Sequence, residues 1–235
     1  MEPIQTNCPQ CGTAATGNHC AACGAKVHPA RITLHSIVHE AFHYFTHLDK
    51  GFGYTLKELF RHPGTMQLEY VNGRRALHQK PFSMFFLCGT ICGLSYYFIN
   101  QGYDRLYGAD NHVESDFFRH YFVLLQAVLM PLYALLAWVA FRKTGRNYAE
   151  ILVLTMYLLS ATFLMLVIFQ LLRLIFPHYD NRILELIFLL IYNPLTNLRF
   201  FGGNKWVSIL KSAVVIVGCY LISQVVSGAF RGLMH

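Results

Sequence analysis

The sequence predicts an all-α integral membrane protein in which about five transmembrane helices follow interfacial amphipathic helices and a small N-terminal head. Of the 235 residues, 54% are hydrophobic and 13% are charged, whereas an ordinary soluble domain is about one quarter charged. The apolar residues lie in uninterrupted blocks, and the charged residues gather between these blocks and in the N-terminal third of the chain. Such blocks are typical of helices that cross a bilayer.

The N-terminal head, residues 1–30, contains two Cys-x-x-Cys pairs, each followed by a glycine that allows the backbone to turn and direct N–H groups toward sulfur. Paired thiolates at this spacing chelate a tetrahedral Zn²⁺, and a metal ion would replace the apolar core that the head lacks. We therefore predict a zinc ribbon with a structural Zn²⁺ bound by Cys8, Cys11, Cys20 and Cys23. With four protein ligands the site has no open coordination position, so it is either a docking module for a protein partner or a cap that is held together by metal and has no chemistry. Free thiolates at this spacing also indicate that the N-terminus lies in a reducing compartment.

Residues 31–80 carry three short amphipathic patterns that we expect to lie on the cytoplasmic membrane surface. From residue 33 to about residue 48, apolar residues recur at helical spacing, and Thr33 is placed to cap that helix. Thr55 and Glu58 form a capping box for a second helix, which ends before His62-Pro63-Gly64. A third helix, from about residue 65 to residue 77, leads into the membrane.

The remaining residues, 81–235, form the predicted transmembrane domain, since a span takes roughly 20 mostly apolar residues. Four apolar segments contain no Asp, Glu, Lys or Arg. A fifth segment contains Glu185, Asn193 and Pro194, and it is either a marginal span or a re-entrant hairpin; we predict a span. The five predicted spans are residues 81–99, 121–141, 151–172, 183–201 and 212–230.

The basic residues predict the orientation of these spans. Lys and Arg total 19 against 12 Asp and Glu, and clusters of them at 74–80, 142–146 and 199–211 all fall on one side if the five segments cross. Short loops rich in Lys and Arg stay in the cytoplasm, so we predict a cytoplasmic N-terminus and an external C-terminal tail. The basic face then meets the anionic inner leaflet, and no nucleic acid partner is expected.

Residues 39–43 read His-Glu-x-x-His, the pattern of zinc peptidases. On a helix, His39 and His43 can both reach a Zn²⁺ with Glu40 as general base, and His47 could supply a third ligand. Because His35 begins an unbroken i, i+4 histidine ladder through His47, three interpretations stay open. They are a catalytic zinc site, a non-catalytic metal or proton-sensing site, and a histidine-rich stripe on an amphipathic surface helix.

Two further features concern contacts of the predicted membrane domain. Gly89 and Gly93 form a Gly-x-x-x-Gly pattern that indicates close helix packing and offers a contact for a homo-oligomer. Arg74, Arg75 and Lys80 lie just before the first span. They either bind a lipid or phosphate headgroup or simply anchor the chain on the cytoplasmic side.

Four short blocks combine turn residues with basic side chains: His47-Leu48-Asp49-Lys50-Gly51-Phe52, Arg61-His62-Pro63-Gly64, Tyr70-Val71-Asn72-Gly73-Arg74-Arg75 and Pro81-Phe82. Together with the double Cys-x-x-Cys ribbon, they resemble an uncharacterised bacterial multi-span membrane family without an assigned activity. The resemblance implies a multi-pass protein of the bacterial cytoplasmic (inner) membrane. It also disfavours Glu40 as a catalytic base, because this residue is replaceable by Asp in the family. More distantly, the arrangement resembles Yip1-like membrane proteins, which implies membrane organisation or partner recruitment.

These features predict a non-enzymatic membrane protein whose ribbon and interfacial platform recruit or scaffold other envelope components, or serve as the accessory part of a transport system. The alternative is a zinc-dependent membrane metallopeptidase or other hydrolase that uses His39, Glu40 and His43. A transporter is a third hypothesis. The sequence disfavours it because one interrupted segment stands where a transporter usually has paired broken helices in two repeats.

Overall fold

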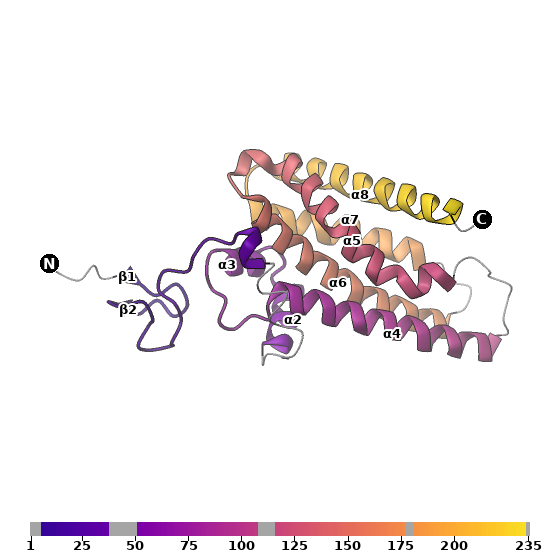
Figure 1. Ribbon diagram of the computed structural model, residues 1–235, viewed down its shortest axis with the longest axis horizontal. Helices are drawn as coiled ribbons and strands as arrows, with labels where there is room; N and C mark the ends of the chain where they lie inside the picture. The colour runs from indigo at the N-terminus through magenta and orange to yellow at the C-terminus, as the bar shows by residue number, and fades with distance from the viewer. Residues whose placement is uncertain (1–5, 38–50, 108–115, 177–180, 234–235) are drawn as a thin grey trace.

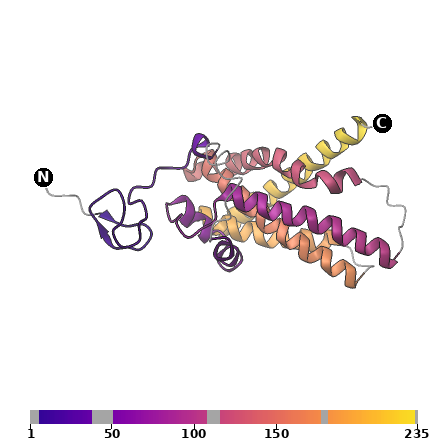
Figure 2. The same cartoon turned by 60° about the horizontal axis from the view of Figure 1, so that its bottom comes forward.

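The computed structural model describes residues 6–37, 51–107, 116–176 and 181–233, and it is mostly helical (Figure 1). Five long helices form an elongated bundle, and the N-terminal head projects from one end of it (Figure 1, Figure 2). A short 3-10 helix, η1 (Arg142–Thr144), joins the second and third of them. The long helices are α4 (Pro81–Tyr107), α5 (Asp116–Phe141), α6 (Tyr148–Ile175), α7 (Asn181–Phe201) and α8 (Lys205–Leu233).

All five long helices are long and apolar enough to cross a membrane, which confirms the predicted fold class. Most of them are longer than the predicted spans. The predicted spans include only the residues needed to cross the hydrocarbon layer, and the helices continue past one or both ends of these spans. α8, for example, begins at Lys205 and not at residue 212. The segment 183–201 lies within α7, which runs through Pro194 as one continuous helix, so this part of the chain forms no re-entrant hairpin.

α6 is the central helix of the bundle and packs against α4, α5 and α7. Its side chains are buried along much of its length, whereas α8 lies at the edge against α5 and α7 and is buried least. The outer surface of the bundle carries large exposed apolar side chains such as Phe98, Val128, Ile191 and Leu210. An apolar outer surface around a helix bundle is typical of contact with lipid. The five helices therefore indicate a multi-pass membrane protein.

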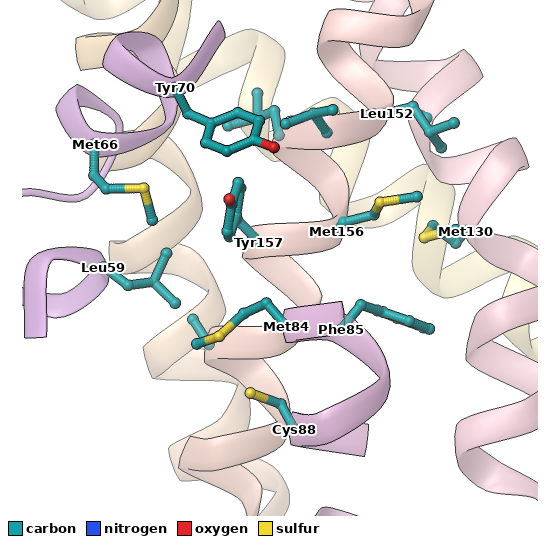
Figure 3. Close-up of a cluster of buried hydrophobic side chains, with 14 of the residues drawn as sticks. Leu59, Met66, Tyr70, Met84, Phe85, Cys88, Met130, Leu152, Met156 and Tyr157 are labelled. Atoms are coloured by element: carbon teal, nitrogen blue, oxygen red, sulfur yellow. The ribbon is translucent and has the colours of Figure 1, made fainter. Parts of the chain in front are cut away.

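Two short helices, α2 (Phe52–Arg61) and α3 (Thr65–Val71), lie at the head end of the bundle. Their buried side chains Leu59, Met66 and Tyr70 belong to the same hydrophobic core as the long helices (Figure 3). Tyr70 packs edge-to-face on Tyr157 of α6, with 5.6 Å between the ring centroids. Residues 52–71 are therefore an integral part of the folded bundle.

The predicted capping box at Thr55 is wrong. α2 begins three residues earlier, at Phe52, and its N-cap Gly51 makes no side-chain capping bond. Thr55 is buried inside the helix, where its Oγ1 accepts a hydrogen bond of 2.7 Å from the backbone N–H of Gln79. The threonine thus joins α2 to the loop before α4. The predicted end of α2 before His62 is confirmed.

Residues 34–37 form the first turn of the helix predicted over 33–48. The Thr33 hydroxyl accepts a hydrogen bond of 3.2 Å from the N–H of Ser36, and the Thr33 N–H donates to Ser36 Oγ at 3.1 Å. This reciprocal pair confirms Thr33 as the N-cap. The rest of this predicted helix lies outside the described residues, and with it the candidate residues His39, Glu40, His43 and His47.

The Gly-x-x-x-Gly pattern packs inside one chain. A Cβ atom at Gly89 would lie 2.7 Å from Val123 of α5 and 3.4 Å from the ring of Phe163 in α6, and one at Gly93 would lie 3.7 Å from Val123. The predicted close helix packing is therefore confirmed. Helices of the same bundle thus pack against this face, and a homo-oligomer contact at Gly89 and Gly93 stays a prediction.

Candidate metal centre

Two short turns bring the four cysteines of the head together. β1 (Thr6–Asn7) pairs antiparallel with β2 (Ala14–Ala15), and an antiparallel β-bridge joins His19 to Lys26. Each of these pairings encloses one Cys-x-x-Cys pair. The four Sγ atoms lie within 4.8 Å of one another, so the residues that the sequence predicted as zinc ligands form one cluster.

The two turns repeat the same backbone hydrogen bonds. The N–H of Gly12 donates to the carbonyl of Cys8, and the N–H of Gly24 donates to the carbonyl of Cys20, both at 2.8 Å. These glycines have positive φ angles of 76° and 71°, a conformation that residues with a side chain rarely adopt. This confirms that glycine permits each turn. The sequence predicted N–H groups directed toward sulfur, but the N–H of each glycine donates to a carbonyl oxygen instead.

The sulfur positions fit a tetrahedral metal ion. Cys8 Sγ lies 3.6 Å from Cys23 Sγ, and Cys11 Sγ lies 3.5 Å from Cys20 Sγ. A Zn–S bond of about 2.3 Å gives a tetrahedron edge of about 3.8 Å, which is close to both distances. Four thiolate ligands would fill the coordination shell of Zn²⁺, so the cluster suits a structural ion and leaves no coordination position for a substrate.

The pKa values of two thiols in the cluster shift in opposite directions. A hydrogen bond with the Thr13 side chain, supported by the Thr13 backbone, lowers the pKa of Cys11 to about 6. A hydrogen bond from the Ala25 backbone favours the thiolate of Cys23, but desolvation and the neighbouring cysteine side chains together raise the pKa of Cys23 to about 12. Thiolates this close repel one another. A metal ion would offset that repulsion and release the remaining protons.

The head buries little apolar surface of its own. Its hydrophobic cluster consists of Cys8, Ala15, Cys20 and Val27, and two of these four are candidate metal ligands. A cluster of this size cannot offset the conformational entropy of a folded segment. Metal coordination would therefore supply most of the free energy that folds the head.

Arg74 and Arg75 attach the head to the end of α3. Arg74 Nε donates to the carbonyl of Pro9, inside the first Cys-x-x-Cys pair, at 2.8 Å. Arg75 donates to the carbonyl of Tyr70 in α3 and to the carbonyl of Ala30, each at 3.1 Å. Both arginines thus bind protein acceptors in this structure. Headgroup binding by Arg74, Arg75 and Lys80 stays a prediction.

The segment of residues 29–32, here called the strap, connects the head to the bundle. Arg31 Nε donates to Glu150 Oε1 at 2.7 Å, and Asn147 Nδ2 donates to the carbonyl of Ile32 at 3.0 Å. None of these contacts was predicted from the sequence. The Asn-x-x-Glu capping box at the start of α6 could have indicated Asn147 and Glu150, but a separation of 119 positions between Arg31 and Glu150 leaves no local pattern for their pairing.

The fold and the site define a mostly helical protein with five candidate membrane-spanning helices and a four-cysteine cluster that could hold a metal ion. Residues 49–93 match a family described as a protein of unknown function (DUF3667). The match covers less than one fifth of the chain and includes α2, α3 and the first half of α4, but not the cysteine cluster. Comparison with curated proteins and with solved structures gives no match.

Proposed function

We propose that this protein is a non-enzymatic scaffold of the bacterial cytoplasmic membrane whose zinc ribbon, on the cytoplasmic side, recruits a protein partner of an envelope or transport assembly. The proposed organisation is a zinc ribbon over residues 1–30, a cytoplasmic segment over 31–80 and a transmembrane domain over 81–235. The observation that carries this proposal is the closed four-cysteine cluster, which suits structural support and not catalysis at the metal.

The attachment of the head supports the proposal. The carbonyl of Pro9 is bound by Arg74, and the strap is held at the start of α6 by Glu150 and Asn147. Much of the head stays exposed, including Ala22 between Cys20 and Cys23. A small rigid module with one face fixed and another face open is suited to binding a partner at a set distance from the membrane.

Metal content tests the ribbon. The purified full chain is expected to contain one zinc per chain, and Cys20→Ser is expected to lose it while the bundle stays helical by circular dichroism. Cys219→Ser, which changes a thiol on α8 outside the cluster, is the matched control and should retain the zinc. A Cys20→Ser protein that keeps its full zinc content would contradict this assignment of the ligands.

Site-specific crosslinking tests recruitment. A photo-crosslinking residue at Ala22 should give a discrete protein adduct in cells, and the adduct should disappear in the Cys20→Ser variant. The same crosslinker at Leu210, on the exposed apolar face of α8, is the control for contacts made merely by membrane crowding. If Ala22 gives no adduct, or gives the same adducts with and without the zinc ligand, the ribbon is not a recruitment module.

The zinc-dependent hydrolase is the second proposal, and it rests on the His-Glu-x-x-His pattern. It requires a second zinc per chain that is lost in His39→Ala, and it requires Glu40 as the base. One zinc per chain, together with full rescue of a deletion phenotype by Glu40→Gln, would exclude it and leave the scaffold.

A further inference from the structure

A polar cavity of about 410 Å³ lies at the head end of the bundle. Four segments line it: the strap, the C-terminal end of α3 at Val71 and Asn72, the turn 144–146, and the first turn of α6 at Glu150. No cysteine of the metal cluster lines this cavity, so it is separate from the candidate metal centre.

Two guanidinium groups in this cavity share one carboxylate. Arg31 Nε lies 2.7 Å from Glu150 Oε1, and Arg146 Nη1 lies 3.9 Å from Glu150 Oε2. The Glu150 side chain is 3% exposed, so its carboxylate lies on the buried side of the cavity, whereas Arg31 reaches the solvent. Two positive charges thus face one negative charge. The cavity therefore keeps a net positive charge.

Both guanidinium groups are held in place by further contacts. Arg31 Nη2 donates to the carbonyl of Gly145 at 3.0 Å, and Arg146 Nη1 donates to Asn72 Oδ1 at 3.2 Å. Glu150 is fixed by the α6 capping box, in which the N–H of Asn147 donates to Glu150 Oε2 at 3.1 Å. Among the described residues, Arg31 Nη1 and Arg146 Nη2 have no hydrogen-bond partner, and the Arg31 side chain is 61% exposed.

We infer that this cavity binds a phosphate group between Arg31 and Arg146. Planar guanidinium groups bind phosphate through paired N–H donors, and donors that are already fixed lose little entropy on binding. The capping box already occupies the N–H of Glu150, so the guanidinium groups, and not the helix end, would supply the donors. The cavity lies where five candidate spans begin or end, at the level expected for lipid phosphates.

The phosphate could belong to a membrane lipid or to a soluble phosphate ester, and a titration separates these sources. The purified full chain in dodecyl maltoside, a detergent without phosphate, is titrated by calorimetry with inorganic phosphate and with dihexanoyl phosphatidic acid. Saturable binding of both probes supports a general phosphate site, and binding of the lipid alone supports a headgroup site. Binding of neither probe would overturn the inference.

Arg146→Gln tests the residues. This variant should weaken binding of the probe at least about tenfold, because it removes charge-assisted hydrogen bonds. Lys143→Gln is the matched control, since it removes one positive charge from the adjacent exposed turn outside the cavity. Arg146→Lys, which keeps the charge but loses the planar fork, should bind with intermediate affinity and guards against a folding defect in Arg146→Gln. Equal binding by Arg146→Gln and the native chain would overturn the assignment.

Glu150→Gln should change the phosphate affinity in the opposite direction from Arg146→Gln. Glutamine preserves the capping box but removes the negative charge that competes with a phosphate, so affinity for the probe should rise severalfold. A purely structural Arg31–Glu150 ion pair predicts a lower thermal midpoint without any gain in affinity. A fall in phosphate affinity in a Glu150→Gln protein of native helicity would contradict the proposed site.

Discussion

The hydroxyl group of Tyr192 supplies a hydrogen bond that α2 cannot make for itself. Within an α-helix the carbonyl of residue 59 would accept the N–H of residue 63, but residue 63 is proline and has no N–H. Tyr192 of α7 donates its hydroxyl to the carbonyl of Leu59 at 2.9 Å instead. Both residues are buried. Tyr192→Phe would therefore leave a buried carbonyl without a donor, at a cost of about 1–3 kcal/mol in the free energy of unfolding.

The measurement is reversible unfolding of the full chain in mixed micelles with a denaturing detergent, followed by circular dichroism. The phenylalanine ring would keep the stacking of Tyr192 on Phe188, whose centroids lie 4.9 Å apart, so the change isolates the hydroxyl group. Tyr220→Phe on the exposed face of α8 is the control and should change stability by less than about 0.5 kcal/mol. An equal effect of both substitutions, or no effect of Tyr192→Phe, would refute the reasoning about α2.

Three further predictions concern packing and pH. Gly51→Ala should destabilise the protein, because the added methyl group would meet the backbone of the loop before α4, whereas Gly53→Ala meets open space and should be neutral or slightly stabilising. Gly89→Leu should destabilise the bundle, while Gly102→Leu, where nothing lies nearby, should not. Desolvation lowers the pKa of His78 below its ordinary value of 6.5 in the folded protein. Below pH 6.5 the unfolded chain therefore binds a proton that the folded chain resists, and the free energy of unfolding falls as the pH falls. Unfolding midpoints should thus be lower in mildly acidic buffer than at pH 7, and the decrease should be smaller in His78→Gln.

The local sequence was sufficient to predict the long helices and the cysteine cluster. A helix in lipid satisfies its own backbone hydrogen bonds, so length and apolar content identify a candidate span without knowledge of its neighbours. The segment 183–201 was found in this way in spite of Pro194. The two Cys-x-x-Cys turns are similarly local, because each is closed by backbone hydrogen bonds between residues only four or five positions apart in the chain.

Patterns that depend on distant partners were misread or missed. Thr55 looked like a helix cap, but the loop residue Gln79 uses its hydroxyl, and the helix accordingly begins earlier. Gly89 indicated a close helix contact, but the pattern did not identify Val123 of α5 as its neighbour. In both cases the residue type was informative, but its partner lay outside the sequence window that the pattern covers.

The sequence by itself therefore determined the five long apolar helices found among the described residues and a cysteine cluster suited to one metal ion, because hydropathy and ligand spacing are properties of short segments. Only the tertiary structure decided how the head is attached and where positive charge collects. Arg31 meets Glu150 across 119 residues, and Arg74 meets the carbonyl of Pro9 across 65. The physical reason is that ion pairs and carbonyl contacts depend on distances of a few ångströms in space, which separation along the chain does not encode.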